Sequence, residues 1–359
     1  MTTSTTSAAP PSPAATSPKV SNACWPATIW WCALAWLLAC QPSCQTAPHP
    51  PADAERLTRS QPLLGTLVTI TVHGGDRVAL NAAVNAAFDE VRAVDRLLSI
   101  HRLDSELSQL NQSASTQSTV ISPALFDVLQ KAFALAAQSE GAFDPTVRPL
   151  VDLWGFIKKE NYRIPTEAEL RAALLRVGHH HVEFNATARS IRFAKADMSI
   201  DPGGFGKGYA VDRAVERLRA LGVTSAMVKA GGDLRVLGLP PGAEQWIVQI
   251  EDPDKRGQRV SIALRGGALS TSGNYENFFE IAGVRYGHLL DPRTGWPVRT
   301  VLSCTVTAPT CLEADALATA CSVLGTAKSM ERLGARYGLR LITDENGQQR
   351  VHQSPLFPK

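Results

Sequence analysis

A glycine-rich turn between an apolar strand and an amphipathic helix is the feature that most constrains how this chain folds. In segment 198–222, MSIDPGGFGKGYAVDRAVERLRALG, a strand ends at Ile200 and a helix begins at about Tyr209. Asp201 stands at the turn, Lys207 adds a positive charge, and four glycines expose backbone amides (Gly203, Gly204, Gly206 and Gly208). Such amides at a helix N-terminus favour a phosphate group. The spacing fits neither a Walker A loop nor a GxGxxG motif, so a plain tight turn remains the alternative.

Strand and helix patterns are mixed along the rest of the chain without strict alternation. Residues 66–72 alternate as a strand, and residues 78–98 carry apolar side chains at helical spacing. A second helix is expected from Ser122 to Gly141, and a third from the capping box Thr166–Glu169 to about Val177. Further strands are expected in a hairpin over 181–193 and at 225–229, 246–251, 260–264 and 302–307. This mixture predicts an α+β fold, one domain with a mixed or antiparallel sheet core and flanking helices, rather than a doubly wound parallel sheet.

The N-terminal region has the shape of an export signal. Polar residues precede an apolar run, Trp25–Ala39, that is too short to span a bilayer as a mature helix. The run ends in Leu-Leu-Ala-Cys40, which resembles the lipobox of bacterial lipoproteins. We therefore expect a signal peptide over 1–39, an acylated Cys40, a flexible tether over 40–57 and a folded domain over 58–356 on the periplasmic side of a membrane. A buried apolar helix is the alternative, but its polar flanks offer it nothing to pack against.

Charge and cysteine usage exclude some classes of protein. The 359 residues carry a formal net charge of +3, and no basic run tracks a nucleic-acid backbone, so no nucleic-acid partner is expected. Seven cysteines are present without a zinc-type pair of CxxC motifs. A disulfide between Cys304 and Cys311 is conceivable in an oxidising compartment, and free cysteines that pack as small apolar residues are the alternative.

Four further segments carry residues suited to a ligand site. They are GAFDPTV followed by LWGF (141–147 and 153–156), AGGDLRVLG (230–238), TSGNYENFF with RYGHLLDPRTGWPV (271–279 and 285–298), and EADALATACSVLG (313–325). The last segment places Asp315 and Thr319 four residues apart, on one face of a helix. Carboxylate and hydroxyl oxygens suit Mg²⁺, which takes a few protein ligands with water and phosphate. An Asp at a helix N-terminus with a core-packed Thr is the alternative.

In their order and spacing these segments closely resemble the FAD:protein FMN transferase (ApbE) family, over about Leu63–Leu324. The resemblance implies Mg²⁺-dependent transfer of the FMN moiety of FAD to a Ser or Thr hydroxyl, with release of AMP. The acceptors it implies are flavin-carrying subunits of membrane redox complexes. It implies metal ligands at Gly204, Asp315 and Thr319. It also implies FAD contacts at Leu64, His101, Ala142, Phe143, Asp144, Asp201, Lys207 and Leu289.

His288 is the expected general base, because a near-neutral imidazole can take a proton from an incoming hydroxyl. Asp201 is the second candidate catalytic residue. A structural histidine bonded to a neighbouring carbonyl is the alternative for His288. The run His179-His180-His181 is interpreted as surface and hairpin residues, because consecutive side chains point in different directions.

The chain departs from the family pattern at two flavin positions. Leu64 stands where the family commonly has Met, and His101 stands where an aromatic residue, usually Tyr, covers the flavin. Because imidazole stacks less broadly, two alternatives stay open. One is an FAD pyrophosphatase that releases FMN and AMP, and the other is a non-catalytic FAD-binding lipoprotein of the periplasm.

Overall fold

The computed structural model describes residues 55–157, 162–251, 253, 259–274, 277–345 and 347–358. All of them lie within one unit of the chain, Pro50–Lys359. The expected signal peptide, the anchor residue Cys40 and most of the expected tether lie outside the described residues. In the described part, no helix has the length and apolar character needed to cross a membrane.

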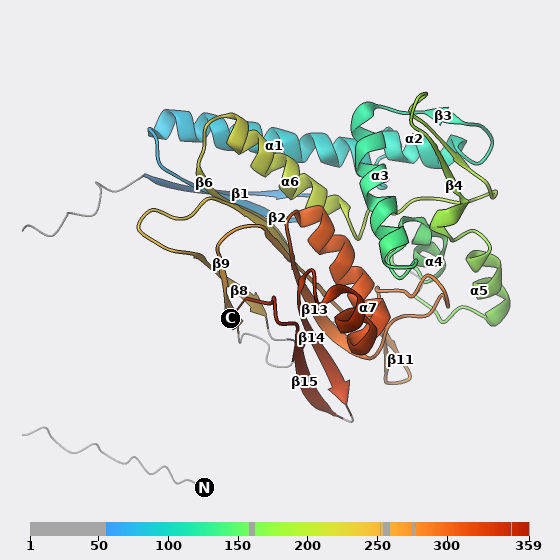
Figure 1. Cartoon of the computed structure of the whole chain (residues 1–359). Coiled ribbons are helices and arrows are strands. Elements are labelled where there is room, and N and C mark those ends of the chain that lie inside the picture. The colour runs from blue at the N-terminus through green and yellow to red at the C-terminus, as the bar shows by residue number, and fades with distance from the viewer. Residues whose placement is uncertain are drawn as a thin grey trace, which may run out of the picture. The chain divides into compact units, whose positions relative to one another are not determined.

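An eight-stranded antiparallel sheet forms the centre of the fold (Figure 1). Its strand order is β1-β2-β6-β7-β10-β13-β14-β15. The strands are β1 (Arg56–Leu63), β2 (Thr66–His73), β6 (Ser225–Ala230), β7 (Asp233–Leu237), β10 (Ala268–Gly273), β13 (Val301–Ala308), β14 (Gly338–Glu345) and β15 (Gln348–Gln353). Tight turns join β1 to β2 and β6 to β7. The strand order brings β1 and β2, near the start of the domain, into the same sheet as β14 and β15, near its end.

Three long helices cover one face of this sheet: α1 (Arg77–Leu98), α6 (Gly206–Ala220) and α7 (Cys311–Leu333) (Figure 1). Their apolar stripes and the strands beneath them bury one continuous core. The N-terminus of α1 is fixed by Asp76, whose carboxylate accepts the amides of Val78 and Ala79. The opposite face packs against the hairpin of β8 (Trp246–Glu251) and β9 (Arg259–Leu264) through a second apolar cluster.

Shorter elements build the part of the domain that flanks the helix layer. They are α2 (Glu106–Ser113), α3 (Pro123–Gln138), α4 (Arg148–Leu153), α5 (Glu167–Leu174), the 3₁₀ turns η1 (Pro145–Val147) and η2 (His179–His181), the sheet of β3 (Thr119–Val120), β5 (Ser190–Phe193) and β4 (Val182–Asn185), and the hairpin of β11 (Phe278–Ile281) and β12 (Val284–Gly287). A third apolar cluster, centred on Trp154, joins α4 and α5 to that hairpin. This cluster holds together the segments 147–156 and 279–290, which lie beside the candidate site.

The predicted α+β class is confirmed, and so are most of the expected helices and strands. The strand expected to end at Ile200 is wrong, because β5 ends at Phe193 and residues 198–200 lie in no strand. The Ser122 hydroxyl caps α3, and the Thr166–Glu169 capping box begins α5. The helix expected at about Tyr209 begins earlier, at Gly206. The Cys304–Cys311 disulfide is not formed. Both cysteines and Cys321 are free and buried, which agrees with the alternative of small apolar packing.

Candidate functional site

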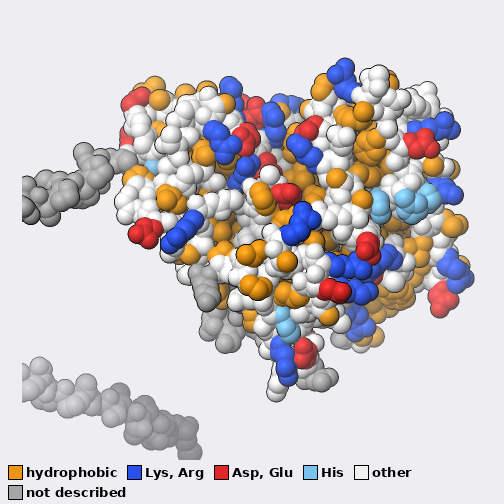
Figure 2. All heavy atoms as spheres, viewed as in Figure 1, with side chains coloured by type: hydrophobic (Ala, Val, Ile, Leu, Met, Phe, Trp, Pro, Cys, Tyr) orange, Lys and Arg blue, Asp and Glu red, His pale blue; other side chains and the backbone are white. Residues whose placement is uncertain are grey.

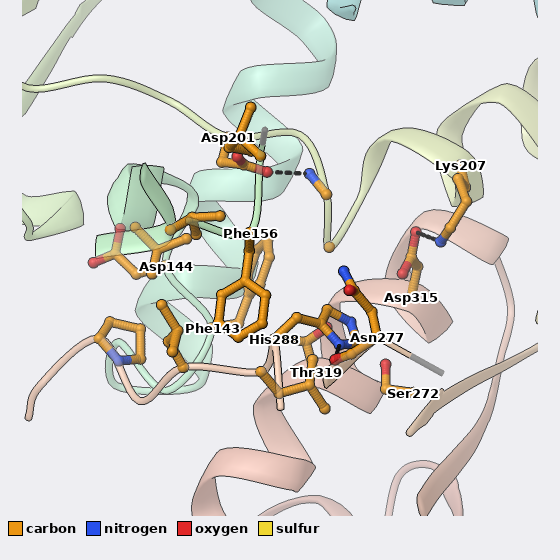
Figure 3. Close-up of a pocket in the computed structure, with 18 of the residues that line it drawn as sticks. Phe143, Asp144, Phe156, Asp201, Lys207, Ser272, Asn277, His288, Asp315 and Thr319 are labelled. Atoms are coloured by element: carbon orange, nitrogen blue, oxygen red, sulfur yellow. Dashed lines mark hydrogen bonds and ion pairs between the residues drawn. The ribbon is translucent and has the colours of Figure 1, made fainter. Parts of the chain in front are cut away.

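A cavity of about 330 Å³ lies where the N-terminus of α6 meets the first turns of α7. Strand β10, the loop after α3 and the loop after β12 complete its wall (Figure 3). All but one of the site residues expected in the folded domain line it: His101, Ala142, Phe143, Asp144, Asp201, Gly204, Lys207, His288, Leu289, Asp315 and Thr319. The exception, Leu64, lines an adjacent cavity of about 290 Å³. The two cavities share His101, Asp201 and Lys207, so they lie next to each other.

Two glycines of the turn bring α6 against α7. A Cβ on Gly208 would collide with the carbonyl oxygen of Cys311, so only glycine allows this approach. The Gly208 amide then donates to Oδ2 of Asp315 at 3.1 Å. A Cβ on Gly204 would lie 3.2 Å from the Thr319 hydroxyl oxygen. The main chain of Gly204 therefore lies directly beside Thr319, one helical turn from Asp315, and these are the three expected metal ligands.

Lys207 and Asp315 form a charged part of the cavity wall, and Asp233, which is not a lining residue, pairs with the lysine. Lys207 Nζ lies 2.5 Å from Oδ2 of Asp233 and 3.6 Å from Oδ2 of Asp315. Burial, reinforced by the Asp233 carboxylate and opposed by Lys207, raises the pKa of Asp315 to about 7. Against the lowering effect of burial, the two carboxylates raise the pKa of Lys207 above its ordinary value. Burial is the largest cause of the raised pKa of Asp315, and the ammonium of Lys207 offsets it only in part.

Asp201 presents a buried oxygen that has no hydrogen-bond partner among the described residues. Its Oδ1 accepts the Gly203 amide at 2.7 Å, whereas Oδ2 is buried without a hydrogen bond to any described residue. Burial raises the pKa of this carboxyl group, against the hydrogen bond from Gly203. Because buried polar atoms are normally hydrogen-bonded, Oδ2 of Asp201 is suited to accept a hydrogen bond from a ligand.

Asp144 has both carboxylate oxygens occupied by the protein. Oδ1 accepts the amide and the hydroxyl of Thr146 at 2.8 and 2.6 Å. Oδ2 accepts the amide of His179 at 2.7 Å and lies 3.3 Å from its ring Nδ1. The carboxylate therefore holds the loop 141–147 in shape, and Phe143 of that loop packs edge-to-face on Phe205. Asp144 lines the cavity, but these bonds engage its carboxylate in positioning the loop.

His288 lies in the cavity with its ring in a fixed orientation (Figure 3). The main-chain carbonyl oxygen of Asn277 is 3.1 Å from its Nδ1 and also accepts its backbone amide at 3.0 Å. A carbonyl only accepts, so Nδ1 carries the proton and the neutral ring has its basic lone pair on Nε2. The Phe156 ring stands edge-to-face against the imidazole, at 6.5 Å between centroids. His288 therefore makes the carbonyl bond of the structural alternative through Nδ1. The expected general-base role would use the other ring nitrogen, Nε2.

The exposed amides expected at the glycine turn are largely used within the protein. The amide of Gly203 donates to Asp201, that of Gly206 to the Pro202 carbonyl, and that of Gly208 to Asp315. The turn therefore shapes the site and fixes two carboxylates. These three amides are therefore engaged by the protein and are not the donors that a phosphate would meet here.

The described residues contain no group of three His, Cys, Asp or Glu side chains able to hold a metal ion. The expected set at this site is different, with one carboxylate, one hydroxyl and one main-chain oxygen. Its hard oxygen donors suit Mg²⁺, which keeps several of its positions for water and phosphate. The oxygen donors fit that ion, and so does the absence of a Cβ at Gly204, which keeps its main chain close to Thr319.

Several residues that line the cavity or bond to a lining residue stand in segments noted in the sequence without having been singled out as site residues. Asp233 follows two glycines at the turn between β6 and β7, and its pairing with Lys207 crosses 26 residues. Asn277 contacts His288 through its main-chain oxygen, and such a contact leaves no trace in the residue type. Phe156 and Ser272 also line the cavity.

Comparisons with known proteins give a consistent result. The ApbE family model matches residues 64–342. An FAD:protein FMN transferase of Treponema pallidum is 35% identical over 295 residues, covering 77% of this chain and 81% of its own length. One of Salmonella typhimurium is 34% identical over 302 residues, covering 82% and 86%.

Two solved structures are also similar. The ApbE protein of Thermotoga maritima superposes with a TM-score of 0.79 at 30% identity, covering 85% of this chain and 100% of its own. The flavin transferase ApbE of Vibrio cholerae superposes with a TM-score of 0.75 at 31% identity, covering 84% and 98%.

Proposed function

The chain belongs to the ApbE family, and we propose on this premise that it transfers the FMN half of FAD to a hydroxyl group of another protein. Its curated relatives carry the name FAD:protein FMN transferase. One structural observation carries the proposal to this chain. Residues from α6, α7, β10 and two loops converge on one cavity that holds a base, a lone acceptor oxygen and a hard-oxygen donor set.

Mg²⁺ fits this site and is part of the proposal. Asp315, Thr319 and the main chain of Gly204 would hold it. When bound it neutralises charge on the phosphates and orients the leaving group. Lys207, paired with Asp233 beside this set, supplies a fixed positive charge next to the same phosphates.

The proposed transfer uses His288 as the proton acceptor. The acceptor protein's Ser or Thr oxygen forms a bond to the FMN-side phosphorus of FAD, and the bond from that phosphorus to the AMP oxygen breaks. The hydroxyl proton goes to Nε2 of His288, because the Asn277 carbonyl holds the proton already present on Nδ1. AMP is the leaving group. The carbonyl contact is what keeps the ring in the tautomer that this step requires.

The second cavity is the proposed place of the flavin ring. Leu64, Val94, Leu98 and His101 are among its lining residues, and Asp201 lines both cavities. Leu64 and Gly65 hold φ values of 55° and 68°, as a two-residue hairpin turn between β1 and β2 requires. The turn places the apolar Leu64 side chain in the lining of this cavity.

The proposed transfer is tested with a chain beginning at Asp53, incubated with FAD, Mg²⁺ and a purified flavin-accepting subunit of a membrane redox complex. Intact mass of the acceptor and quantitation of AMP are the two readouts. We expect the acceptor to gain one FMN for each AMP released, and EDTA to abolish both. AMP released without labelling would instead support an FAD pyrophosphatase, and FAD binding with neither product would support a non-catalytic flavin binder.

Lipid anchoring through Cys40 on the periplasmic side of a bacterial membrane is a second part of the proposal. Its support is the sequence LLAC that ends the apolar run 25–39. We expect Cys40→Ser to move the protein from the membrane fraction to the soluble fraction, with FAD turnover unchanged. Fractionation of cells followed by an activity assay checks both results. A variant that stays with the membranes would contradict the anchor.

A further inference from the structure

Lys207 stands between two buried carboxylates and is bonded to the one that lies outside the proposed metal set. Its Nζ is 2.5 Å from Asp233 and 3.6 Å from Asp315. Asp233 is itself fixed, because it is 1% exposed and its Oδ1 accepts the hydroxyl of Ser270 on the neighbouring strand β10. The lysine thus has a rigid counterion on the sheet and a second carboxylate on α7.

We propose that Asp233 is a positioning residue that holds the Lys207 ammonium away from Asp315, so that Asp315 can bind a divalent cation. This inference rests on the proposed metal site. It assigns to Asp233 a task distinct from ligation, namely to decide which of two positive charges Asp315 meets.

The geometry shows why such a holder is needed. The ammonium lies next to Asp315, and a shift of roughly 0.8 Å would bring it to an ordinary ion-pair length of about 2.8 Å. The Lys207 side chain is 35% exposed, and its ammonium keeps a counterion where it meets the two buried carboxylates. If Asp233 loses its charge, Asp315 is the remaining carboxylate within reach, and Lys207 then competes with the metal for it. At the effective dielectric of a partly buried pair, that shortening corresponds to roughly a tenfold change in affinity.

The orientation of the Asp315 carboxylate makes it a second ion-pair partner for the Lys207 ammonium. Oδ2 of Asp315 accepts the Gly208 amide, which fixes the carboxylate toward α6, the helix that carries Lys207. Lysine and metal therefore compete at a carboxylate whose own position is set by the backbone. Asp233, fixed on the sheet, is the element that separates them.

Binding of Mn²⁺ to the full chain in detergent, without FAD, is the direct test, with free Mn²⁺ counted by electron paramagnetic resonance. We expect Asp233→Asn to weaken Mn²⁺ binding about tenfold, and Asp233→Asn/Lys207→Met to restore it to at least the affinity of the parent. Glu90→Gln is the matched control. It removes a carboxylate that pairs with Arg213 of α6 outside the cavity, and it should leave Mn²⁺ affinity unchanged.

A purely structural role of Asp233 would lower the unfolding temperature of both Asp233 variants and leave the Mn²⁺ affinity of Asp233→Asn equal to that of the parent. That result would overturn the inference, as would a double variant that binds as weakly as the single one. If Asp233→Asn does not fold, Ser270→Ala loosens the same carboxylate. It should weaken Mn²⁺ binding by a few-fold, and unchanged affinity there would refute the inference.

The result also separates this inference from the function on which it rests. A parent chain that binds no Mn²⁺ would refute the metal set and this inference together, whereas acceptor labelling still reports on flavin transfer. Unchanged Mn²⁺ affinity in Asp233→Asn, with acceptor labelling intact in the parent, would refute the positioning role alone.

Discussion

Replacement of Asp315 by Ala is expected to lower Mg²⁺-dependent release of AMP roughly a thousandfold, because the site loses its only proposed carboxylate ligand. The fold should persist. Asp315 is 3% exposed, but its contacts are the Gly208 amide and Lys207, and the lysine retains Asp233. The substitution leaves one buried amide without an acceptor, which lowers the free energy of unfolding by about 1–3 kcal/mol. Turnover at saturating Mg²⁺ and circular dichroism of the same sample check the two halves of this prediction. Equal turnover in variant and parent would refute the metal assignment.

Asp315→Asn is the matched control, since its amide oxygen can still accept the Gly208 amide. Asp315→Asn should lose turnover as Asp315→Ala does, and its stability should differ from that of the parent. The folded pKa of Asp315, about 7, lies above the ordinary value of 3.8, so without a bound cation the parent loses stability as the pH rises through this interval. Above pH 7 and without Mg²⁺, Asp315→Asn is therefore expected to unfold at a higher temperature than the parent. Thermal unfolding in EDTA measures this difference.

The parts of the fold that sequence predicted are those decided by local chemistry. The hydroxyl of Ser122 and the box of Thr166 with Glu169 begin α3 and α5, because each satisfies amides of its own helix. The spacing of four residues places Asp315 and Thr319 on the same face of a helix. These features need no knowledge of the rest of the chain.

The features that sequence missed depend on distant pairing. Asp233 reaches Lys207 only because the β6–β7 turn lies beneath the start of α6, and His179 occupies Asp144 across 35 residues. The glycine turn shows the same limit. Its amides were expected to be exposed for a phosphate, and that three of them bond instead to Asp201, Pro202 and Asp315 follows from tertiary packing. Residue types locate a site, and long-range contacts decide which atoms remain for a ligand.

Replacement of His288 by Ala is expected to lower the rate of FMN transfer by roughly 10²–10⁴-fold, the usual contribution of a positioned general base. FAD affinity should change little, because the ring contacts the Asn277 carbonyl and Phe156 and the proposed flavin wall lies in the adjacent cavity. A loss in kcat with an unchanged dissociation constant for FAD is the expected signature. Added imidazole should restore part of the rate, since it can occupy the vacated space and accept the same proton.

His180→Ala is the matched control for His288, because His180 is an exposed histidine outside the cavity and its loss should leave the rate unchanged. AMP release by His288→Ala without an acceptor distinguishes two roles for the base. If His288 activates whichever hydroxyl enters the site, hydrolysis and transfer should fall together. If transfer falls alone, the histidine acts on the protein hydroxyl and water reaches phosphorus by another route. Equal transfer rates in His288→Ala and parent would contradict the general-base role and leave the Asn277 contact as the whole function of this residue.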